Sequence, residues 1–273
     1  MSMPSQIENC FRALGESQRT AFMPFITAGD PDMGMTRALI RELSASGVDL
    51  IEVGFPYSDP IADGPVIQAS YTRALEKQLH VRDIFAGISE LDTQSLPPLV
   101  AMVSYAIIFR IGAEAFLSQA AQAGFSGMIV PDLPGDEAAD FFQLVRAENL
   151  DLVQLVAPTT PRERVREILK SCSGFVYCIA VSGTTGVREE IAEELLAQLR
   201  WLREETDLPL CVGFGISRPE HIDPLRGLAD GAIVGSGIVR HLESLADGDA
   251  DRETVVKLIG NFAARMSAAC HRE

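Results

Sequence analysis

The chain has 273 residues, of which 47% are hydrophobic and 22% are charged. That composition is ordinary for a folded globular protein and argues against a collagen, a coiled coil or a disordered chain. With 23 Lys and Arg against 38 Asp and Glu, the formal net charge is −15 at pH 7. Nucleic-acid phosphates and anionic membranes would repel such a chain, so neither is expected as a partner.

Cysteine usage and the lack of targeting segments indicate a cytoplasmic protein. The five cysteines are odd in number, scattered, and never spaced as C-x-x-C, so we expect reduced thiols. Residues 1–10 lack the basic and apolar regions of a signal peptide. The longest apolar stretch, 96–109, is too short to span a bilayer.

Short apolar runs alternate with longer amphipathic stretches along the chain. We expect strands at 21–27, 50–53, 98–103, 127–130, 152–156, 175–181, 208–212 and 232–234. We expect helices at 35–45, 81–91, 113–123, 135–149, 161–171, 188–205, 218–227 and 251–269. A further helix at 5–14 precedes the first strand. Apolar runs with little alternation suit strands that are buried on both faces of a parallel sheet.

Eight alternations over about 250 residues predict an α/β fold, a (β/α)₈ TIM barrel with an extra N-terminal helix. A doubly wound open sheet is the alternative, but it usually has fewer strands, and no G-x-G-x-x-G follows the first run. Without a linker or a low-complexity tract, residues 1–273 are expected to form one domain. The active site of a barrel lies at the carboxyl ends of its strands, so the candidate residues are sought there.

Glu52 is a carboxylate inside an otherwise apolar run, followed by a stiff loop that carries Asp59 and Asp63. An ionised carboxylate cannot be buried unpaired without a large cost, so Glu52 must be partnered or neutral. Burial also raises a carboxyl pKa, which makes the group usable as an acid or base near pH 7. The alternatives are a structural Glu bonded to backbone, and ordinary Asp-Pro and Asp-Gly turns.

Two glycine-rich turns follow the seventh and eighth runs, at 213–217 and 235–237, the second opening a short helix at Ile238. Barrels commonly bind phosphate in these two loops and at a helix N-terminus, where glycine lets N–H groups approach an anion. Ser236 adds a hydroxyl. Each turn taken alone is more often structural. A third turn, 182–186, reads as a mobile lid or as a plain solvent loop. Tyr177, just before it, is placed to point into the barrel mouth.

Several kinds of catalytic apparatus are missing from the sequence. The three lysines, Lys77, Lys170 and Lys257, fall outside the strand ends, which disfavours a Schiff-base aldolase. The four histidines lie outside the apolar runs, and neither H-x-H nor H-E-x-x-H occurs, which disfavours a zinc site. No cofactor or metal is therefore expected, and the chemistry is assigned to carboxylates.

The chain resembles the tryptophan synthase alpha chain family along nearly its full length. The resemblance is carried by Pro24-Phe25-Ile26-Thr27-Ala28-Gly29-Asp30-Pro31, the 51–68 segment, Val130-Pro131-Asp132-Leu133-Pro134, Ala157-Pro158-Thr159-Thr160-Pro161, 213–217 and Gly235-Ser236. The Glu…Pro-x-Ser-Asp-Pro-x-Ala-Asp-Gly-Pro pattern within 52–65 is highly specific.

The resemblance implies a cofactor-free retro-aldol cleavage of indole-3-glycerol phosphate to indole and glyceraldehyde 3-phosphate. It also implies an α₂β₂ partnership with a PLP-dependent tryptophan synthase beta chain, to which indole is passed. In the family's pattern Glu52 protonates indole C3 and takes the hydroxyl proton, and Asp63 holds the indole N–H. The other matching positions are Tyr177 and Thr185, which support the carboxylates; Gly186, Gly215, Gly235 and Ser236, which bind phosphate; and Phe25 and Phe214, which line the indole pocket.

Two positions depart from the family's usual pattern. Val181 stands where the lid loop usually has an arginine, and Ala106 stands where an asparagine is often found. Valine cannot make the bonds that an arginine makes across a closed lid. Coupling to a beta chain is therefore open, and the alternatives are a lyase that works alone and releases indole, or a phosphate-ligand-binding regulatory subunit without turnover.

Overall fold

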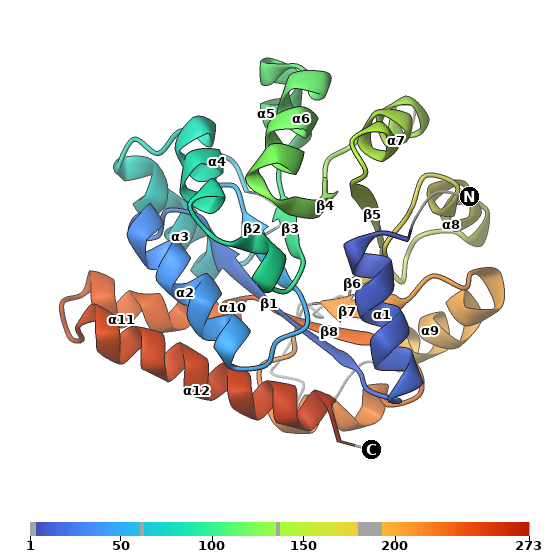
Figure 1. Cartoon of the computed structure of the whole chain (residues 1–273). Coiled ribbons are helices and arrows are strands. Elements are labelled where there is room, and N and C mark those ends of the chain that lie inside the picture. Colours follow the sequence, from blue (N-terminus) through green and yellow to red (C-terminus); the bar gives the residue numbers. More distant parts are fainter. Residues whose placement is uncertain (1–3, 61–62, 135–136, 180–192, 214, 273) are drawn as a thin grey trace.

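The computed structural model describes residues 4–60, 63–134, 137–179, 193–213 and 215–272. Within them, eight parallel strands pair in chain order, and β8 pairs with β1 to close the barrel (Figure 1). The strands are β1 (Ala21–Thr27), β2 (Ile51–Gly54), β3 (Leu99–Met102), β4 (Phe125–Ile129), β5 (Asp151–Val156), β6 (Val176–Ile179), β7 (Leu210–Gly213) and β8 (Gly231–Val234). The predicted (β/α)₈ barrel is confirmed.

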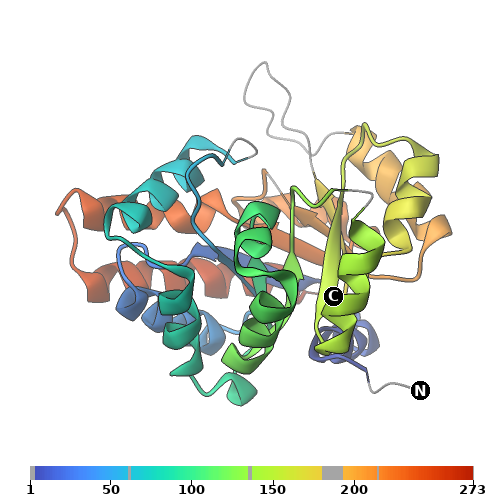
Figure 2. The ribbon, with the colours of Figure 1, turned by 90° about the horizontal axis from the view of Figure 1, so that it is seen from above.

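Helices surround the strands on the outside of the barrel (Figures 1 and 2). The α-helices are α1 (Gln6–Glu16), α2 (Met33–Ala45), α3 (Pro65–Glu76), α4 (Val81–Ser89), α5 (Tyr105–Ile111), α6 (Ala113–Ala123), α7 (Ala138–Ala147), α8 (Arg162–Leu169), α9 (Glu193–Glu205), α10 (Ser236–Val239), α11 (Glu243–Ala246) and α12 (Arg252–Cys270). Short 3₁₀ turns are η1 (Thr93–Ser95), η2 (Pro219–His221), η3 (Asp223–Leu225) and η4 (Arg240–Leu242).

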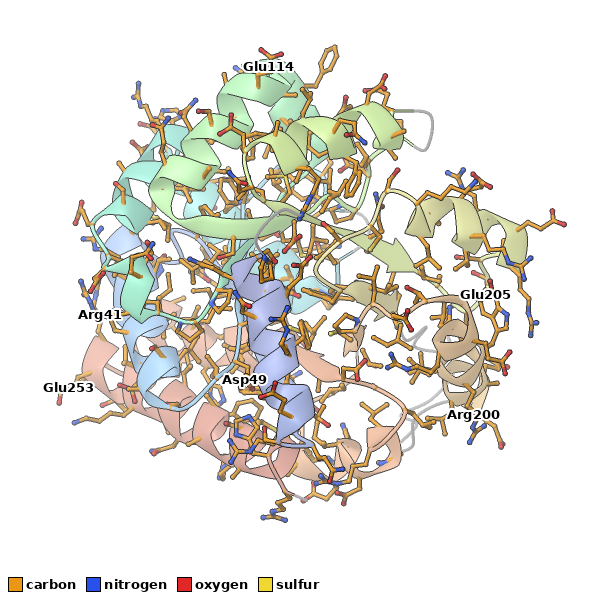
Figure 3. All side chains as sticks on the ribbon, turned by 45° about the vertical axis from the view of Figure 1, so that its right-hand side comes forward. Arg41, Asp49, Glu114, Arg200, Glu205 and Glu253 are labelled. Atoms are coloured by element: carbon orange, nitrogen blue, oxygen red, sulfur yellow. The ribbon has the colours of Figure 1, made fainter. Side chains whose placement is uncertain are left out.

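Successive residues of a strand pack into two separate cores, one inside the barrel and one between the strands and the helices. This explains why apolar and polar residues do not alternate along the runs. Residues such as Met23, Leu50 and Val100 pack together inside the barrel. Their neighbours in sequence, such as Phe22 and Ile51, pack against the helices outside. Both faces of each strand are therefore buried, as in other all-parallel sheets. Charged side chains lie on the outer surface, as Glu114, Arg200 and Glu253 do in Figure 3.

Helix α1 lies at the opposite end of the barrel from α3 (Figure 2). Ser5 caps its N-terminus in a capping box with Glu8, so the predicted extra helix begins one residue later than expected and runs to Glu16. The Ser5 hydroxyl also donates to Asp151 at 2.5 Å, and Arg146 pairs with the other oxygen of that carboxylate. Because Asp151 is fully buried at the start of β5, this contact fixes α1 to the barrel.

Some of the expected elements differ in the structure. The helix expected at 218–227 is the pair of 3₁₀ turns η2 and η3, because Pro224 lies in the interior of the expected helix and lacks the N–H that an α-helix needs there. Helices α3 and α5 were not predicted. Helix α10 begins at Ser236 rather than at Ile238. Among the described helices, none combines the length and the apolar character needed to cross a membrane.

Candidate active site

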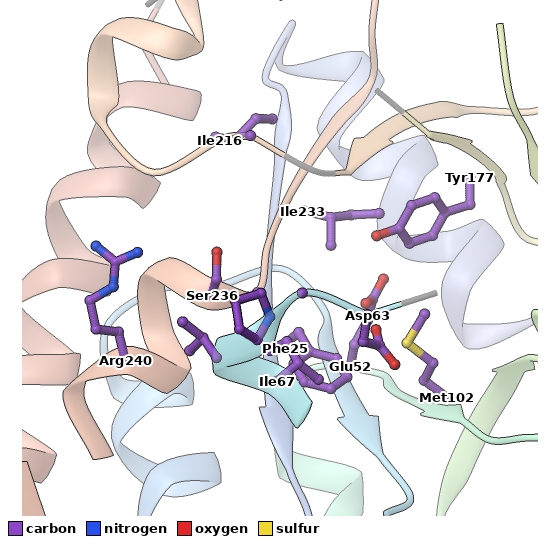
Figure 4. Close-up of a pocket in the computed structure, with 15 residues that line it drawn as sticks. Phe25, Glu52, Asp63, Ile67, Met102, Tyr177, Ile216, Ile233, Ser236 and Arg240 are labelled. Atoms are coloured by element: carbon purple, nitrogen blue, oxygen red, sulfur yellow. The ribbon is translucent and has the colours of Figure 1, made fainter. Parts of the chain in front are cut away.

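A cavity of about 260 Å³ opens at the carboxyl ends of the strands, where the barrel rule places an active site (Figure 4). It is about the size expected for a small ligand. Its described lining residues are Phe25, Glu52, Asp63, Gly64, Pro65, Val66, Ile67, Met102, Tyr177, Gly215, Ile216, Ile233, Gly235, Ser236 and Arg240. Side chains from both predicted carboxylates and from both glycine-rich turns therefore meet in one place.

Glu52 points into the barrel from β2, in register with Phe25 of β1 and Val100 of β3. Its side chain is only 1% exposed, and neither carboxyl oxygen has a hydrogen-bond partner among the described residues. Burial alone raises its pKa from 4.5 to about 8, because the charged form loses hydration without gaining a partner. A structural Glu bonded to backbone is thus not what the structure contains.

Asp63 reaches the cavity from the loop after β2, and burial raises its pKa from 3.8 to about 6. Two hydrogen bonds to backbone carbonyl groups hold the loop in place. The Asp63 N–H donates to the Pro60 carbonyl at 3.1 Å, and the Gln68 amide of α3 donates to the Asp63 carbonyl at 2.7 Å. Pro65 starts α3, where its missing N–H costs nothing. Asp59, by contrast, is exposed and accepts from Ser58.

Tyr177 lies on β6 inside the barrel, and its side chain lines the same cavity as Glu52 and Asp63 (Figure 4). Its pKa lies well above the usual 10, because the phenol is buried and because Glu52 and Asp63 lie near it. The ring packs directly over Gly213 of β7, where a Cβ atom would overlap the phenol. Gly213 therefore has a steric role, since it leaves room for the tyrosine.

The glycine-rich turns bring Gly215, Gly235 and Ser236 to the other side of the same cavity. Gly215 has φ +81°, a left-handed conformation that glycine adopts without strain. Ser236 is the first residue of α10, which has only four residues. Such a short helix supplies little macrodipole, so the turns contribute mainly their backbone N–H groups.

Apolar side chains form the remaining walls. Phe25 and Ile67 pack with Tyr71, and Ile233 faces them from β8 (Figure 4). Gly54 leaves space for Phe25, and a Cβ there would lie 2.8 Å from the Tyr71 hydroxyl. Of these residues only Phe25 was predicted. Ile67, Met102 and Ile233 look like ordinary core residues, and their place at inward-facing strand ends or on α3 is the one signal that could have found them.

Three predicted site residues, Thr185, Gly186 and Phe214, lie outside the described residues, as does Val181. A further lining residue, Arg240, was not predicted from the sequence. Among the described residues, no group of three or more His, Cys, Asp or Glu side chains is placed to hold a metal ion.

A parallel (β/α)₈ barrel whose strand ends enclose two carboxyl groups of raised pKa is typical of an enzyme. The family model described as "Tryptophan synthase alpha chain" matches residues 11–270. The chain belongs to the tryptophan synthase alpha chain family, and it is a lyase of tryptophan biosynthesis.

The relatives agree with this assignment. The tryptophan synthase alpha chain of Rhodopirellula baltica is 48% identical over 239 residues, which is 86% of each chain. That of Rippkaea orientalis is 42% identical over 266 residues, 97% of this chain and 98% of the relative. A crystal structure of the subunit from Legionella pneumophila has a TM-score of 0.87 at 32% identity, covering 98% of this chain and 99% of that one.

Proposed function

We propose that the cavity cleaves indole-3-glycerol phosphate into indole and glyceraldehyde 3-phosphate by acid–base catalysis at Glu52 and Asp63. The observation that carries the proposal is the pair of carboxyl groups in one cavity whose pKa values are separated by their surroundings, about 8 for Glu52 and about 6 for Asp63. At pH 7 the first group is mainly protonated and the second mainly ionised, so one can act as an acid while the other stabilises positive charge.

The reaction follows from those protonation states. The Glu52 carboxyl gives its proton to indole C3, and the Asp63 carboxylate accepts a hydrogen bond from the indole N–H, which becomes positively charged. The Glu52 carboxylate then takes the proton of the hydroxyl on the adjacent side-chain carbon. The bond between that carbon and C3 breaks, its electrons restore the aromatic ring, and the carbon becomes the aldehyde of the triose phosphate.

The remaining contacts suit the same substrate. Phe25, Ile67 and Ile233 offer an apolar wall to the indole ring, and Gly215, Gly235 and Ser236 offer donors to the phosphate. We assign Tyr177 to orienting the carboxylates, since Glu52 and Asp63 both lie near its hydroxyl in the cavity. Thr185, Gly186 and Phe214 keep the supporting roles that the family pattern implies.

The proposal is tested by measuring indole release from indole-3-glycerol phosphate by the purified chain and by Glu52→Gln and Asp63→Asn. Each variant is expected to lose roughly 10²- to 10⁴-fold in rate, since each removes one acid–base group. Asp59→Asn, on the same loop but exposed, is the control and should keep its rate. Normal indole release by Glu52→Gln or by Asp63→Asn would refute the role given to that residue.

We further propose that the chain works in the cytoplasm as one domain, residues 1–273, with a PLP-dependent beta chain. The support for a partner is an exposed aromatic side chain on α5, the helix that follows β3. Phe109 is 75% exposed there, and the centroid of its ring lies 6.3 Å from that of Tyr105, one turn earlier. Aromatic side chains are enriched at protein–protein interfaces.

Adding a purified beta chain separates this reading from the two alternatives. A complex that changes the rate of indole release supports the paired enzyme. Release at the same rate with no complex supports a lyase that works alone, which Ala106 on the same helix would favour, because its side chain cannot hydrogen-bond across an interface. Binding of the substrate with no cleavage under either condition would identify a regulatory subunit.

A further inference from the structure

The cavity wall beside Ser236 carries a cation that no motif predicted. Arg240 follows α10 directly and has helical backbone angles, φ −53° and ψ −34°. Residues four apart in a helix lie on one face, so Ser236 and Arg240 are neighbours on the same surface. Both line the cavity, and in Figure 4 the serine hydroxyl and the guanidinium lie on the same side of the helix.

Apart from Arg240, the charges of the described cavity residues would repel an anionic substrate. Among its described lining residues, Arg240 is the only positively charged one, against the carboxyl groups of Glu52 and Asp63. With a pKa of about 6, Asp63 is mainly ionised at pH 7, and the whole chain carries −15. A phosphate monoester brings a further −1.5 to −2 charges, approximately, at this pH. The N–H groups of the glycine turns carry only partial positive charge, so a full cation beside them would add to the attraction for phosphate.

Arg240 is exposed, and it has no ion-pair partner among the described residues. Other arginines of the molecule hold carboxylates, as Arg73 holds Asp30 and Arg252 holds Asp32. The ion pairs between described residues do not include Arg240. Its field is nevertheless felt locally, because the pKa of His241 is lowered by burial first and then by Arg240 and by Arg265 of α12.

We propose that the Arg240 guanidinium is the cationic partner of the substrate's phosphate group and makes the site specific for a dianionic phosphate ester. The proposal rests on the proposed function and deepens it by naming a binding residue outside the family's glycine and serine pattern. A guanidinium offers paired N–H donors that match two phosphate oxygens, which a lysine ammonium matches less well. Arg240 contacts the phosphate, far from the bond that breaks, so it governs binding rather than the chemical step.

The test compares Arg240→Gln and Arg240→Lys with Arg265→Gln. Arg265 is the matched control because it also faces His241 and carries the same charge, but it does not line the cavity. Two quantities are measured at fixed ionic strength: the Kd of inorganic phosphate by calorimetry, and kcat and KM for indole-3-glycerol phosphate. Arg240→Gln should weaken phosphate binding and raise KM roughly tenfold or more with kcat nearly unchanged. Arg240→Lys should fall between, and Arg265→Gln should change each value less than twofold.

Unchanged phosphate affinity in Arg240→Gln overturns the proposal, and so does no measurable phosphate binding by the parent chain. Equal losses in Arg240→Gln and Arg265→Gln also overturn it, because they would reveal a general field rather than a contact. A fall in kcat with unchanged KM does the same. The phosphate Kd needs no turnover, so a chain that binds phosphate through Arg240 but releases no indole refutes the proposed reaction and leaves the binding assignment standing.

Discussion

At the scale of single residues, Glu52 combines a structural cost with a chemical use. Its buried carboxyl has a pKa of about 8 against 4.5 in an exposed chain. Between those pH values the folded state keeps a proton that the unfolded state releases, so rising pH favours unfolding. Below pH 4.5 both states are protonated, and the group contributes no pH dependence.

Replacing this carboxyl should therefore stabilise the fold while it stops the reaction. The unfolding free energy of Glu52→Gln, minus that of the parent chain, is expected to grow by up to about 1.4 kcal/mol per pH unit between 4.5 and 8. Urea unfolding at pH 5, 6.5 and 8 measures it. Asp63 also titrates but is present in both proteins, so its contribution cancels. A difference that stays constant with pH would contradict the burial of an unpaired carboxyl.

The same pKa values predict how the rate depends on pH. Cleavage requires protonated Glu52 and ionised Asp63, so kcat/KM for indole-3-glycerol phosphate should be highest between about 6 and 8. The alkaline limb is the diagnostic one, because the acid limb overlaps the second ionisation of the phosphate ester. A rate that keeps rising beyond pH 9 would show that Glu52 is not the acid.

At the scale of elements, the barrel depends on glycines that make room for site side chains. Gly213→Ala on β7 places a methyl group inside the Tyr177 ring, so the tyrosine or the strand must move. We expect a loss of stability of about 1–3 kcal/mol, as for other overpacked sites, together with a fall in kcat as the Tyr177 ring shifts within the cavity. Gly15→Ala in α1, where a Cβ meets nothing within 4 Å, is the control. Its stability should be equal or slightly higher.

The N-terminal helix offers a second prediction at this scale. Ser5→Ala removes the cap of α1 and the hydroxyl that bonds Asp151, so stability should fall by about 1–2 kcal/mol. Ser17→Ala, at the other end of the same helix, should cost less, because Ser17 lies exposed and bonds only within its own helix. Thermal unfolding compares the two, and equal effects would show that Ser5 does not anchor the helix.

The elements that the sequence could predict are those with one dominant pattern. The eight strands are short, mainly apolar runs, so their order and approximate bounds followed directly. Helix α3 was missed because it starts within the loop that carries Asp63, where glycines and prolines read as turns. The 3₁₀ turns after β7 were predicted as a helix, because the spacing of apolar residues over 218–227 is helical. The two prolines in that segment did not outweigh this pattern in the prediction.

At the scale of the whole molecule, the sequence predicted where the site lies but not all of the residues that line it. Glu52, Asp63 and the glycine turns have residue types that stand out in their positions, and barrel geometry brings strand ends together. Arg240 does not stand out, since it is one arginine among many in helical sequence. The glycine-rich turn from β8 into α10 was predicted, but the direction in which a side chain four residues further on points was not.

The surface of the molecule is strongly acidic, with a net charge of −15, and few large apolar side chains lie on it. Among the described residues those that do are Phe109 and Ile111 on α5 and Leu258 on α12. Phe109 and Ile111 are two residues apart, so they point to different faces of α5. Charge keeps such a chain apart from its own copies, whereas an exposed aromatic side chain favours a specific partner. This contrast favours a specific interface over non-specific association.

Phe109→Ser tests that reading. Its affinity for a purified tryptophan synthase beta chain should fall roughly tenfold or more, because truncating a central aromatic commonly costs 1.4 kcal/mol or more, approximately. Leu258→Ser on α12 is the matched control: the residue is 45% exposed and apolar but lies on a different helix, so the affinity of this variant should not change. Calorimetry gives both values, and thermal unfolding checks that each variant is folded. Equal affinity of the parent chain and Phe109→Ser would remove α5 from the interface.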